Sequence, residues 1–306
     1  MIEFESDHPL SIVNKDDVVV IRSGPEQLTH GLFGQGLAWV LGVLYVLESL
    51  DISPDQVLWD LNARGYGRVV PGYIRRRSKN KDILEQDREV KIFNLVQLKQ
   101  AYQFAFLDLE APFETAHRLF YDWFEISDEV ENMVPREINE HWLGLHYRGT
   151  DKQKDRMETN PVSRSEFLFL AQELYQNQDF YGVFICSDET EFIELARSTF
   201  HDVKVTSIEQ TRVTEQDRPQ FTTVLWDSDS ARELALYAIA DVLALSRCGH
   251  VMKGSSAFSA WAKILRPQCQ LHQVSITRPK WFPVGAVPAY EPLSAEAKEI
   301  LKRTYA

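Results

Sequence analysis

A run of mostly polar and ionisable residues at 146–152, His-Tyr-Arg-Gly-Thr-Asp-Lys, directly follows an apolar segment at 142–145. The apolar segment has the composition of a buried β-strand. In open α/β sheets, ligands bind at the carboxyl ends of the strands. The planar guanidinium of Arg148 can pair there with two phosphate oxygens at once. These residues therefore predict a site for an anionic, nucleotide-like ligand.

His146 and Arg148 are two positions apart on the expected strand, so their side chains face the same side. His146 can hydrogen-bond a base, a ribose or a sugar, and Arg148 can neutralise charge that grows on a leaving phosphate. The alternative is a histidine satisfied by its neighbours and an arginine in a surface ion pair. Asp151 and Lys152 in the same turn make that alternative less favourable, because so many ionisable groups at a strand end are costly unless they are used.

Four more residues suit the same kind of ligand. Ser255 and Ser256 open an expected helix, where free backbone N–H groups and hydroxyls can hold an anion, although one of the serines could simply cap the helix. Asp188 ends an expected strand and can bind ribose hydroxyls or cap the next helix. Asp241 interrupts an apolar helical stretch, where an unpaired carboxylate is costly, so it is either a guanine ligand or an acceptor for backbone amides.

Strands and helices alternate along both halves of the chain, which is typical of an α/β protein. In the first half, an expected strand at 17–21 is followed by a glycine-rich turn at 31–36 and a helix to about residue 50. The further elements expected there are a strand at 57–60, an exposed loop at 65–80, a strand at 90–96, and helices at 111–123 and 127–139.

In the second half, Ser163 and Glu166 have the spacing of a capping box at the start of a helix. The expected strands are 142–146, 182–188, 203–207, 250–252 and 270–276, and the expected helices are 163–176, 189–200, 228–245, 255–265 and 294–302. We therefore predict two Rossmann-like domains, 1–139 and 140–306, that face each other across a cleft, the second ending in a helix.

Composition limits the classes of function. The chain has 306 residues, 44% of them hydrophobic and 25% charged, and a net charge of −12, which favours a soluble globular protein over broad binding to nucleic acids or anionic membranes. The longest apolar-rich run, 36–50, is too short to cross a bilayer and contains Glu48. The chain has three scattered cysteines, which predict buried thiols and favour the reducing cytoplasm. The sequence contains no His-x-x-x-His or Cys-x-x-Cys pattern, so it gives little support to a metal site.

Together these segments resemble the α-1,6-, protein-O- and nodulation-factor fucosyltransferases, which share the two-Rossmann GT-B fold. The strongest match is 143–152, which is similar to that family's His-x-Arg-x-x-Asp-Lys motif. Residues 184–188 resemble its strand ending in Thr/Ser-Asp, and residues 241–256 resemble its aspartate helix, strand and Ser-Ser turn. The resemblance covers about 17–60 and 140–266.

The resemblance implies an inverting, metal-independent transfer of fucose from GDP-fucose to a glycan or glycoconjugate hydroxyl, with no cofactor. Arg148 would hold the β-phosphate and stabilise departing GDP, Lys152 would support the pyrophosphate, and Asp151 would orient this basic pair. The donor-binding residues that it implies are His146 and Asp241 on the guanosine, Ser255 and Ser256 on the diphosphate, Gly34 with Phe33 in the glycine-rich first loop, and Asp188.

One position departs from the family's pattern. Some members carry a glutamate a few residues after the motif's lysine that can act as base, but this chain has Arg156. Asp155 and Glu158 are nearby candidates, and removal of the acceptor proton stays unassigned. Two alternatives remain open: a nucleotide-sugar-binding protein without catalysis, and a Rossmann-type enzyme with another anionic substrate, such as a phosphatase or an NAD enzyme with Asp60 after its second strand.

Overall fold

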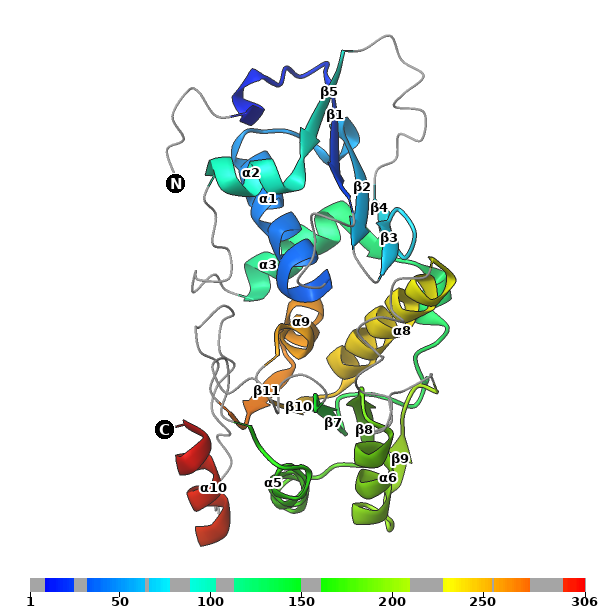
Figure 1. Ribbon diagram of the computed structural model, residues 1–306, viewed down its shortest axis with the longest axis vertical. Helices are drawn as coiled ribbons and strands as arrows, with labels where there is room; N and C mark the ends of the chain where they lie inside the picture. Colours follow the sequence, from blue (N-terminus) through cyan, green and yellow to red (C-terminus); the bar gives the residue numbers. More distant parts are fainter. Residues whose placement is uncertain are drawn as a thin grey trace. The chain divides into compact units, whose positions relative to one another are not determined.

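The chain divides into two compact units (Figure 1). The computed structural model describes residues 9–24, 32–63, 66–77, 89–102, 113–149, 161–209, 228–254, 256–275 and 294–305. The first unit comprises Met1–Val130 and Leu225–Leu236, and the second comprises Glu131–Val224 and Tyr237–Ala306. Helix α8 (Ser228–Arg247) therefore contributes residues to both units. The division into functional domains at 139/140 stays a prediction.

The first unit is built on a four-stranded sheet with the order β3-β2-β1-β5. The central strand β1 (Val18–Ser23) runs parallel to β2 (Val57–Ala63) and β5 (Val90–Asn94), and β3 (Gly67–Val70) pairs antiparallel with β2. Most residues of β1 are buried, as expected for an apolar strand with neighbours on both sides. The remaining elements of this unit are β4 (Ile74–Arg76), α2 (Leu95–Tyr102), α3 (Phe113–Trp123), β6 (Phe124–Ile126) and most of the short α4 (Asp128–Glu131).

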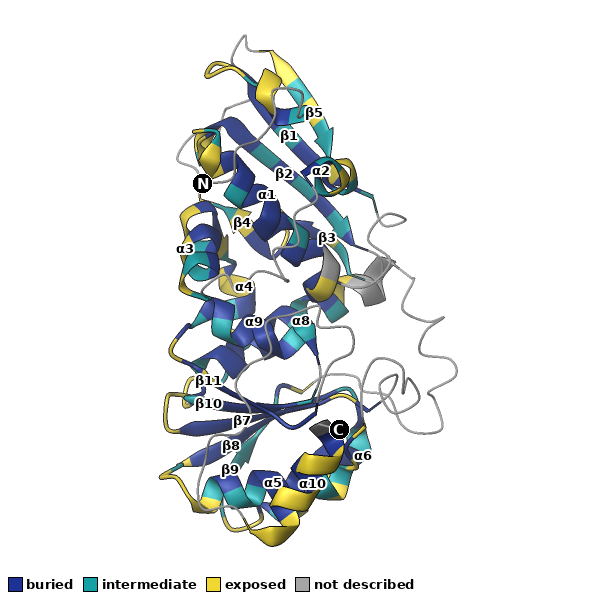
Figure 2. Ribbon diagram, turned by 90° about the vertical axis from the view of Figure 1, so that its left-hand side faces the viewer, coloured by how far each residue is buried: buried dark blue, intermediate teal, exposed yellow. Residues whose placement is uncertain are grey.

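Helix α1 (Leu37–Ser49) follows a π-helical turn, Leu32–Gly36, and packs against α2 and α3. Its side chains are buried nearly all round, as the dark blue ribbon in Figure 2 shows. With the preceding turn, the segment Leu32–Ser49 is long and apolar enough to cross a membrane by length and composition, and 71% of it is buried inside the structure. The expectation that the apolar run at 36–50 is too short to cross a bilayer is therefore wrong for the longer segment Leu32–Ser49. A buried core helix of a soluble protein meets the same criteria of length and apolar composition.

The second unit contains a five-stranded sheet with the order β11-β10-β7-β8-β9, in which all neighbouring strands are parallel. The strands are β7 (Trp142–Tyr147), β8 (Gly182–Ser187), β9 (Lys204–Thr206), β10 (His250–Lys253) and β11 (Gln270–Gln273). Figures 1 and 2 show helices on both faces of this sheet: α5 (Arg164–Gln176), α6 (Thr190–Thr199) and α10 (Ala295–Tyr305) on one, and α8 with α9 (Ala257–Leu265) on the other. Because both faces are covered, every residue of β7 and β8 is buried.

The two faces of β7 carry different side chains. Leu143 and Tyr147 belong to the apolar cluster that β7 forms with α5, α6 and α10. Gly144 faces the opposite layer, where an added Cβ would lie 2.9 Å from Leu245 of α8. Because alternate residues of a strand share a face, His146 lies on the side of Gly144 and meets α9. Strand alternation therefore directs the first candidate residue toward the helix that begins at the carboxyl edge of the sheet.

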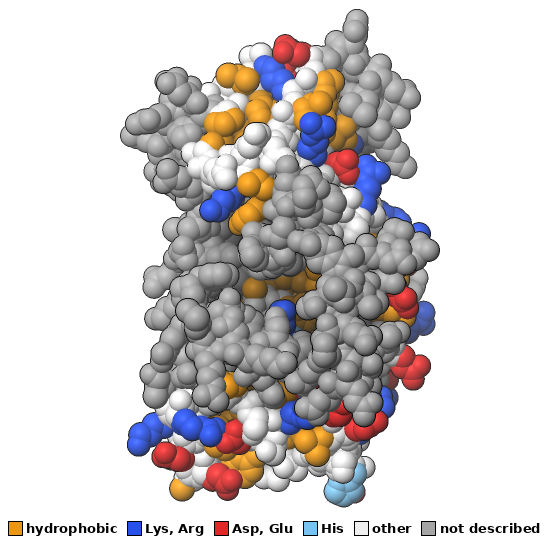
Figure 3. Space-filling model, viewed as in Figure 1, with side chains coloured by type: hydrophobic (Ala, Val, Ile, Leu, Met, Phe, Trp, Pro, Cys, Tyr) orange, Lys and Arg blue, Asp and Glu red, His pale blue; other side chains and the backbone are white. Residues whose placement is uncertain are grey.

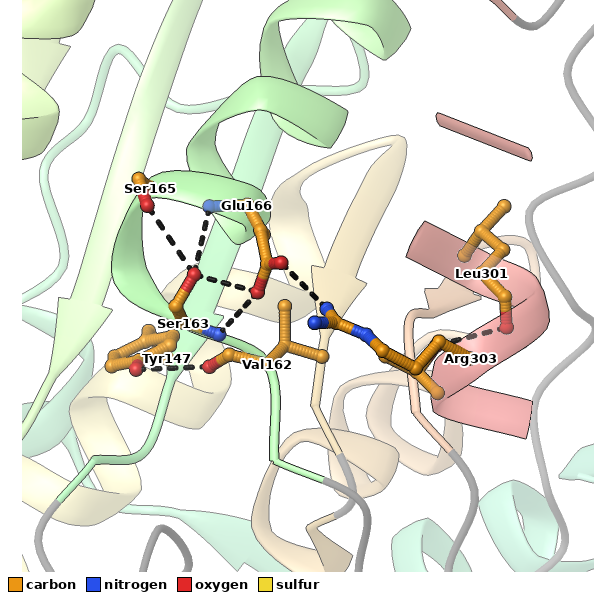
Figure 4. Close-up of polar contacts among 8 residues, drawn as sticks. Tyr147, Val162, Ser163, Ser165, Glu166, Leu301 and Arg303 are labelled. Carbon is orange, nitrogen blue, oxygen red and sulfur yellow. Dashed lines mark hydrogen bonds and ion pairs between the residues drawn. The ribbon is translucent and has the colours of Figure 1, made fainter. Parts of the chain in front are cut away.

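Helix α5 begins with the capping box that the sequence predicts (Figure 4). The Glu166 backbone N–H donates to Ser163 Oγ at 3.3 Å, and the Ser163 backbone N–H donates to Glu166 Oε2 at 3.0 Å. Arg303 of α10 donates to the other carboxylate oxygen of Glu166 at 2.6 Å. The Tyr147 hydroxyl donates to the Val162 carbonyl at 3.1 Å, directly before the cap. These contacts join the start of α5 to the last helix and to the end of β7.

Most of the predicted strands and helices are confirmed within a few residues, and all three cysteines are buried as expected. Two predictions for the first half are wrong. The expected loop at 65–80 contains strands β3 and β4, and Arg76 donates to the Val57 carbonyl at 3.2 Å. The expected helix at 127–139 is reduced to Asp128–Glu131. Strand β4 exists because it pairs with β6, a contact between distant segments that local periodicity does not encode.

In Figure 3, Lys and Arg side chains lie next to Asp and Glu side chains near the foot of the view. Exposed ion pairs among the described residues of the second unit include Arg303 with Glu166 and Lys302 with Glu299. This is the usual pattern of solvated helix faces, and each such pair contributes little to stability.

Replacing Ser163 by alanine removes the acceptor for the first-turn N–H of α5. We expect Ser163→Ala to lower the free energy of unfolding by about 1 kcal/mol in chemical denaturation. The control is Ser165→Ala, because the exposed Ser165 hydroxyl contacts only the Ser163 hydroxyl within the described residues. The control should stay within about 0.5 kcal/mol of the wild type. Equal losses in both variants would contradict the capping role.

Candidate functional site

A row of polar side chains crosses the carboxyl edge of the second sheet. Cys186 of β8, His146 of β7, Lys253 of β10 and Gln273 of β11 are Cα partners in successive strands. Residues in register on neighbouring strands point to the same face, so all four side chains lie on the side covered by α8 and α9. The sheet register, rather than proximity in sequence, therefore brings these residues together.

His146 is the centre of this row and is 5% exposed. Its Nδ1 lies 2.9 Å from the Ser259 hydroxyl, and its ring stacks on Phe258 with centroids 4.9 Å apart. Burial, and then the charges of Lys253 and Arg148, lower the pKa of His146 well below its usual range. At neutral pH the imidazole is therefore uncharged, and it acts as a hydrogen-bonding group rather than a cation.

Lys253 lies beside His146, and no motif in the sequence marks it as a site residue. Its side chain is 2% exposed, and Nζ donates to the Gly254 carbonyl at 2.9 Å and to Gln273 Oε1 at 3.1 Å. Gln273 in turn donates from Nε2 to the Ser275 carbonyl at 2.7 Å. Burial lowers the pKa of Lys253 to about 7. The available signal was a single lysine at the end of an apolar strand, immediately before a Gly-Ser-Ser turn.

Ser256 lies at the N-cap position of α9 but does not cap the helix. Its backbone is extended, its side chain makes no capping hydrogen bond, and the buried hydroxyl has no hydrogen-bond partner in the part of the chain that the structure describes. The first N–H groups of any helix lack partners within that helix and favour negative charge. The capping alternative is therefore not realised at Ser256, and Ser255 lies outside the described residues.

The turn after β7 is held from the side by the end of β8. The Gly149 N–H donates to Asp188 Oδ1 at 3.2 Å, so Asp188 supports the backbone beside Arg148. Glu189 is fully buried, and Arg164 of α5 pairs with its Oε2 at 2.7 Å. A Cβ on Gly149 would lie 2.2 Å from the Glu189 carboxyl carbon. The exposed Arg148 thus stands next to a backbone that two carboxylates fix in place.

The sequence pattern predicts Glu189 only as the first residue of a helix. The structure makes it the N-cap residue of α6 and shows no side-chain hydrogen bond to that helix. The sequence signal was an Asp-Glu pair directly after a buried strand. Its partner, Arg164, is the first residue of α5, a position that carries no functional pattern of its own.

The other predicted residues divide into three groups. Asp241 is 3% exposed on α8, in the second unit. Phe33 is buried and Gly34 exposed in the turn before α1, in the first unit. The residues that lie outside the described part of the chain are Asp151, Lys152, Asp155, Arg156, Glu158 and Ser255.

Asp60 does not support the NAD alternative. In that hypothesis its carboxylate would bind ribose hydroxyls after the second strand. Instead, Asp60 Oδ1 accepts a hydrogen bond from Arg68 Nε of the neighbouring β3 at 2.7 Å. Asp60 and Arg68 therefore form an exposed ion pair between β2 and β3, and this surface contact explains the carboxylate at position 60.

No protein-family model and no curated protein sequence matches this chain. Solved structures do match. The selenomethionine form of fucosyltransferase NodZ from Bradyrhizobium has a TM-score of 0.51 and 13% identity over 83% of this chain and 94% of that one. NodZ alpha-1,6-fucosyltransferase co-crystallised with GDP has a TM-score of 0.50 and 14% identity over 83% and 94%. POFUT1 in complex with GDP-fucose has a TM-score of 0.46 and 9% identity over 84% and 96%.

The fold prediction is therefore confirmed: the chain has a fucosyltransferase-like GT-B fold with parallel sheets. At these identities the likeness concerns the fold, and the roles of individual residues have to be argued from the site itself.

Gly149→Ala should push the Glu189 carboxylate away from Arg164, because this carboxylate is enclosed and lies within 3 Å of the position of the added Cβ. We expect a loss of about 2–4 kcal/mol in the free energy of unfolding. Glu189→Ala makes room for the new methyl group, so adding Gly149→Ala to it should cost less than about 1 kcal/mol. The control is Gly254→Ala, where the nearest atom to the added Cβ is the Ser275 hydroxyl oxygen, 4.0 Å away.

The measurement is a double-mutant cycle by chemical denaturation. If Gly149→Ala costs the same with and without Glu189, the proposed contact between the turn and this carboxylate is wrong.

Proposed function

We propose that this protein is an inverting glycosyltransferase that transfers fucose from GDP-fucose to a hydroxyl of a glycan or glycoconjugate, without a metal ion and in the cytoplasm. The observation that carries the proposal is the carboxyl edge of the second sheet, where His146, Lys253 and Ser256 surround the start of α9. Arg148 follows β7 at the same edge. In a chain with the fold of NodZ, which was co-crystallised with GDP, this edge suits a nucleoside diphosphate.

The chemistry of an inverting transfer explains why these residue types are needed. The acceptor oxygen attacks the anomeric carbon of fucose from the side opposite the β-phosphate, and the bond to the phosphate oxygen breaks. The bonding electrons leave with GDP, so negative charge grows on the β-phosphate. A guanidinium at position 148 stabilises that charge through paired hydrogen bonds. Lys152 is proposed to support the same phosphates.

The neutral imidazole of His146 is suited to the nucleoside rather than to the phosphates. It is buried beside Lys253 and bonded to the Ser259 hydroxyl, so it offers a fixed hydrogen-bonding edge without charge. We assign it, with Asp241, to the guanosine. Asp155 and Glu158 remain the candidates for the base that takes the acceptor proton.

Calorimetric titration tests the donor. We expect metal-independent binding of GDP and GDP-fucose in preference to UDP and NADH, measured first without metal and then with magnesium. His146→Phe keeps the ring stack on Phe258 but removes the nitrogens, and it should weaken GDP binding roughly 10- to 100-fold. Preference for UDP or NADH in the wild type would show that the fucosyltransferase proposal is wrong. GDP binding without transfer or donor hydrolysis across an acceptor panel would favour a binding protein instead.

Arg148→Ala tests the leaving-group role. We expect turnover of GDP-fucose to fall roughly 10²- to 10³-fold, because the growing charge on GDP loses a charge-assisted contact. Arg197→Ala is the matched control, since Arg197 is exposed on α6 and bonds the Ser207 hydroxyl at 3.1 Å. Donor turnover at the wild-type rate in Arg148→Ala would contradict the mechanism.

A further inference from the structure

Lys253 is a buried lysine that bonds no carboxylate among the described residues. An ammonium group carries three N–H bonds, and two of them are used by neutral acceptors, the Gly254 carbonyl and Gln273 Oε1. Within the described residues, neither a third acceptor nor a carboxylate lies within bonding distance of Nζ. A charged group is costly to bury unless it is paired, so this position is unfavourable for the charged form.

The groups that face Lys253 do not relieve that cost. On β7 they are the uncharged His146 and, beyond it, the cation Arg148. On β11 the facing residue is the neutral Gln273. On α9 the Ser259 hydroxyl bonds His146, and the buried Asp241 of α8 makes no contribution to the lowered pKa of Lys253. Burial alone lowers that pKa, to about 7.

The place of Lys253 connects it to an anion site. It immediately precedes Gly254, and its Nζ bonds the carbonyl of Gly254. Two positions further along the chain, the buried Ser256 hydroxyl has no partner among the described residues, and α9 begins. One lysine, one unpartnered hydroxyl and the first N–H groups of a nine-residue helix therefore converge at one corner of the sheet.

We infer that Lys253 is the counter-ion of this anion site: above neutral pH it is largely uncharged in the empty protein and takes up one proton from solvent when the diphosphate of a nucleotide binds at the start of α9. The inference rests on the proposed function for the identity of the ligand. The proton adds to the lone pair of Nζ, and the resulting ammonium neutralises part of the diphosphate charge. When the diphosphate leaves, the same proton returns to solvent.

The direction of the pH effect follows from linkage. A bound anion favours the ammonium form, so the pKa of Lys253 rises from about 7 in the empty site to a higher value in the complex. Between those two values, binding takes up a proton, and affinity falls as the pH rises, by roughly tenfold per pH unit. Below the lower value Lys253 is already charged, and its contribution no longer depends on pH.

The experiment is calorimetric titration of the full chain with GDP and, separately, with inorganic pyrophosphate, at about pH 8 in buffers of different ionisation enthalpy. The slope of the observed enthalpy against the ionisation enthalpy gives the number of protons taken up. We expect the wild type to take up about one proton more than Lys253→Met. The protons that the ligand itself gains or loses are the same in both titrations, so the difference reports on Lys253. Lys253→Met should also bind GDP roughly 10- to 100-fold more weakly.

Lys253→Gln separates charge from structure. Its amide can still donate to the Gly254 carbonyl, but it cannot take up a proton. We expect it to behave like Lys253→Met in proton uptake and affinity. If Lys253→Gln restores wild-type GDP affinity, or if the wild type binds GDP with no more proton uptake than the variants, the inference is overturned while the proposed function stands. The glutamine variant also serves as the test if Lys253→Met does not fold.

The pyrophosphate titration distinguishes a failure of the inference about Lys253 from a failure of the proposed function. If GDP does not bind but pyrophosphate binds with Lys253-dependent proton uptake, the inference about Lys253 is supported and the fucosyltransferase proposal is wrong. If neither ligand binds, both are overturned.

Discussion

Two ionisable side chains, His146 and Lys253, lie side by side on adjacent buried strands, and the rest of the site depends on how the protein accommodates them. The two buried side chains are unfavourable as a pair of cations, because like charges repel each other in a low-dielectric interior and each charged group loses its solvation. The neighbouring Ser259 and Gln273 are therefore neutral hydrogen-bonding partners. Among the described residues, no carboxylate bonds either side chain, so an anionic ligand is complementary to this corner of the sheet edge.

A second constraint fixes the backbone that presents Arg148. Gly149 sits against the enclosed Glu189 carboxylate, and Arg164 of α5 holds that carboxylate in place. Asp188 accepts the Gly149 N–H from the same strand end. Because these supports come from β8 and α5, the turn is positioned by rigid elements rather than by its own residues. A site that stabilises charge on a leaving group requires such fixed geometry.

Both constraints arise from one feature of the second unit, a parallel sheet with helices on both faces. Covering both faces forces alternate residues of β7 into different environments: Leu143 and Tyr147 enter the apolar core, whereas His146 meets α9. The strands end and the helices begin at the carboxyl edge, which is where ligands bind in open α/β sheets.

Local sequence patterns predict the alternating strands and helices of the second half, the capping box of Ser163 and Glu166, and the importance of the segment that begins at His146, because these depend on periodicity and on residue types a few positions apart. They do not determine β4, which needs its distant partner β6. Nor do they identify Lys253 or Glu189. Lys253 becomes significant only because strand register places it between His146 and Gln273, and Glu189 only because a chain segment forty positions away approaches closely enough to require glycine. Pairing between distant segments sets these contacts, and no local pattern encodes it.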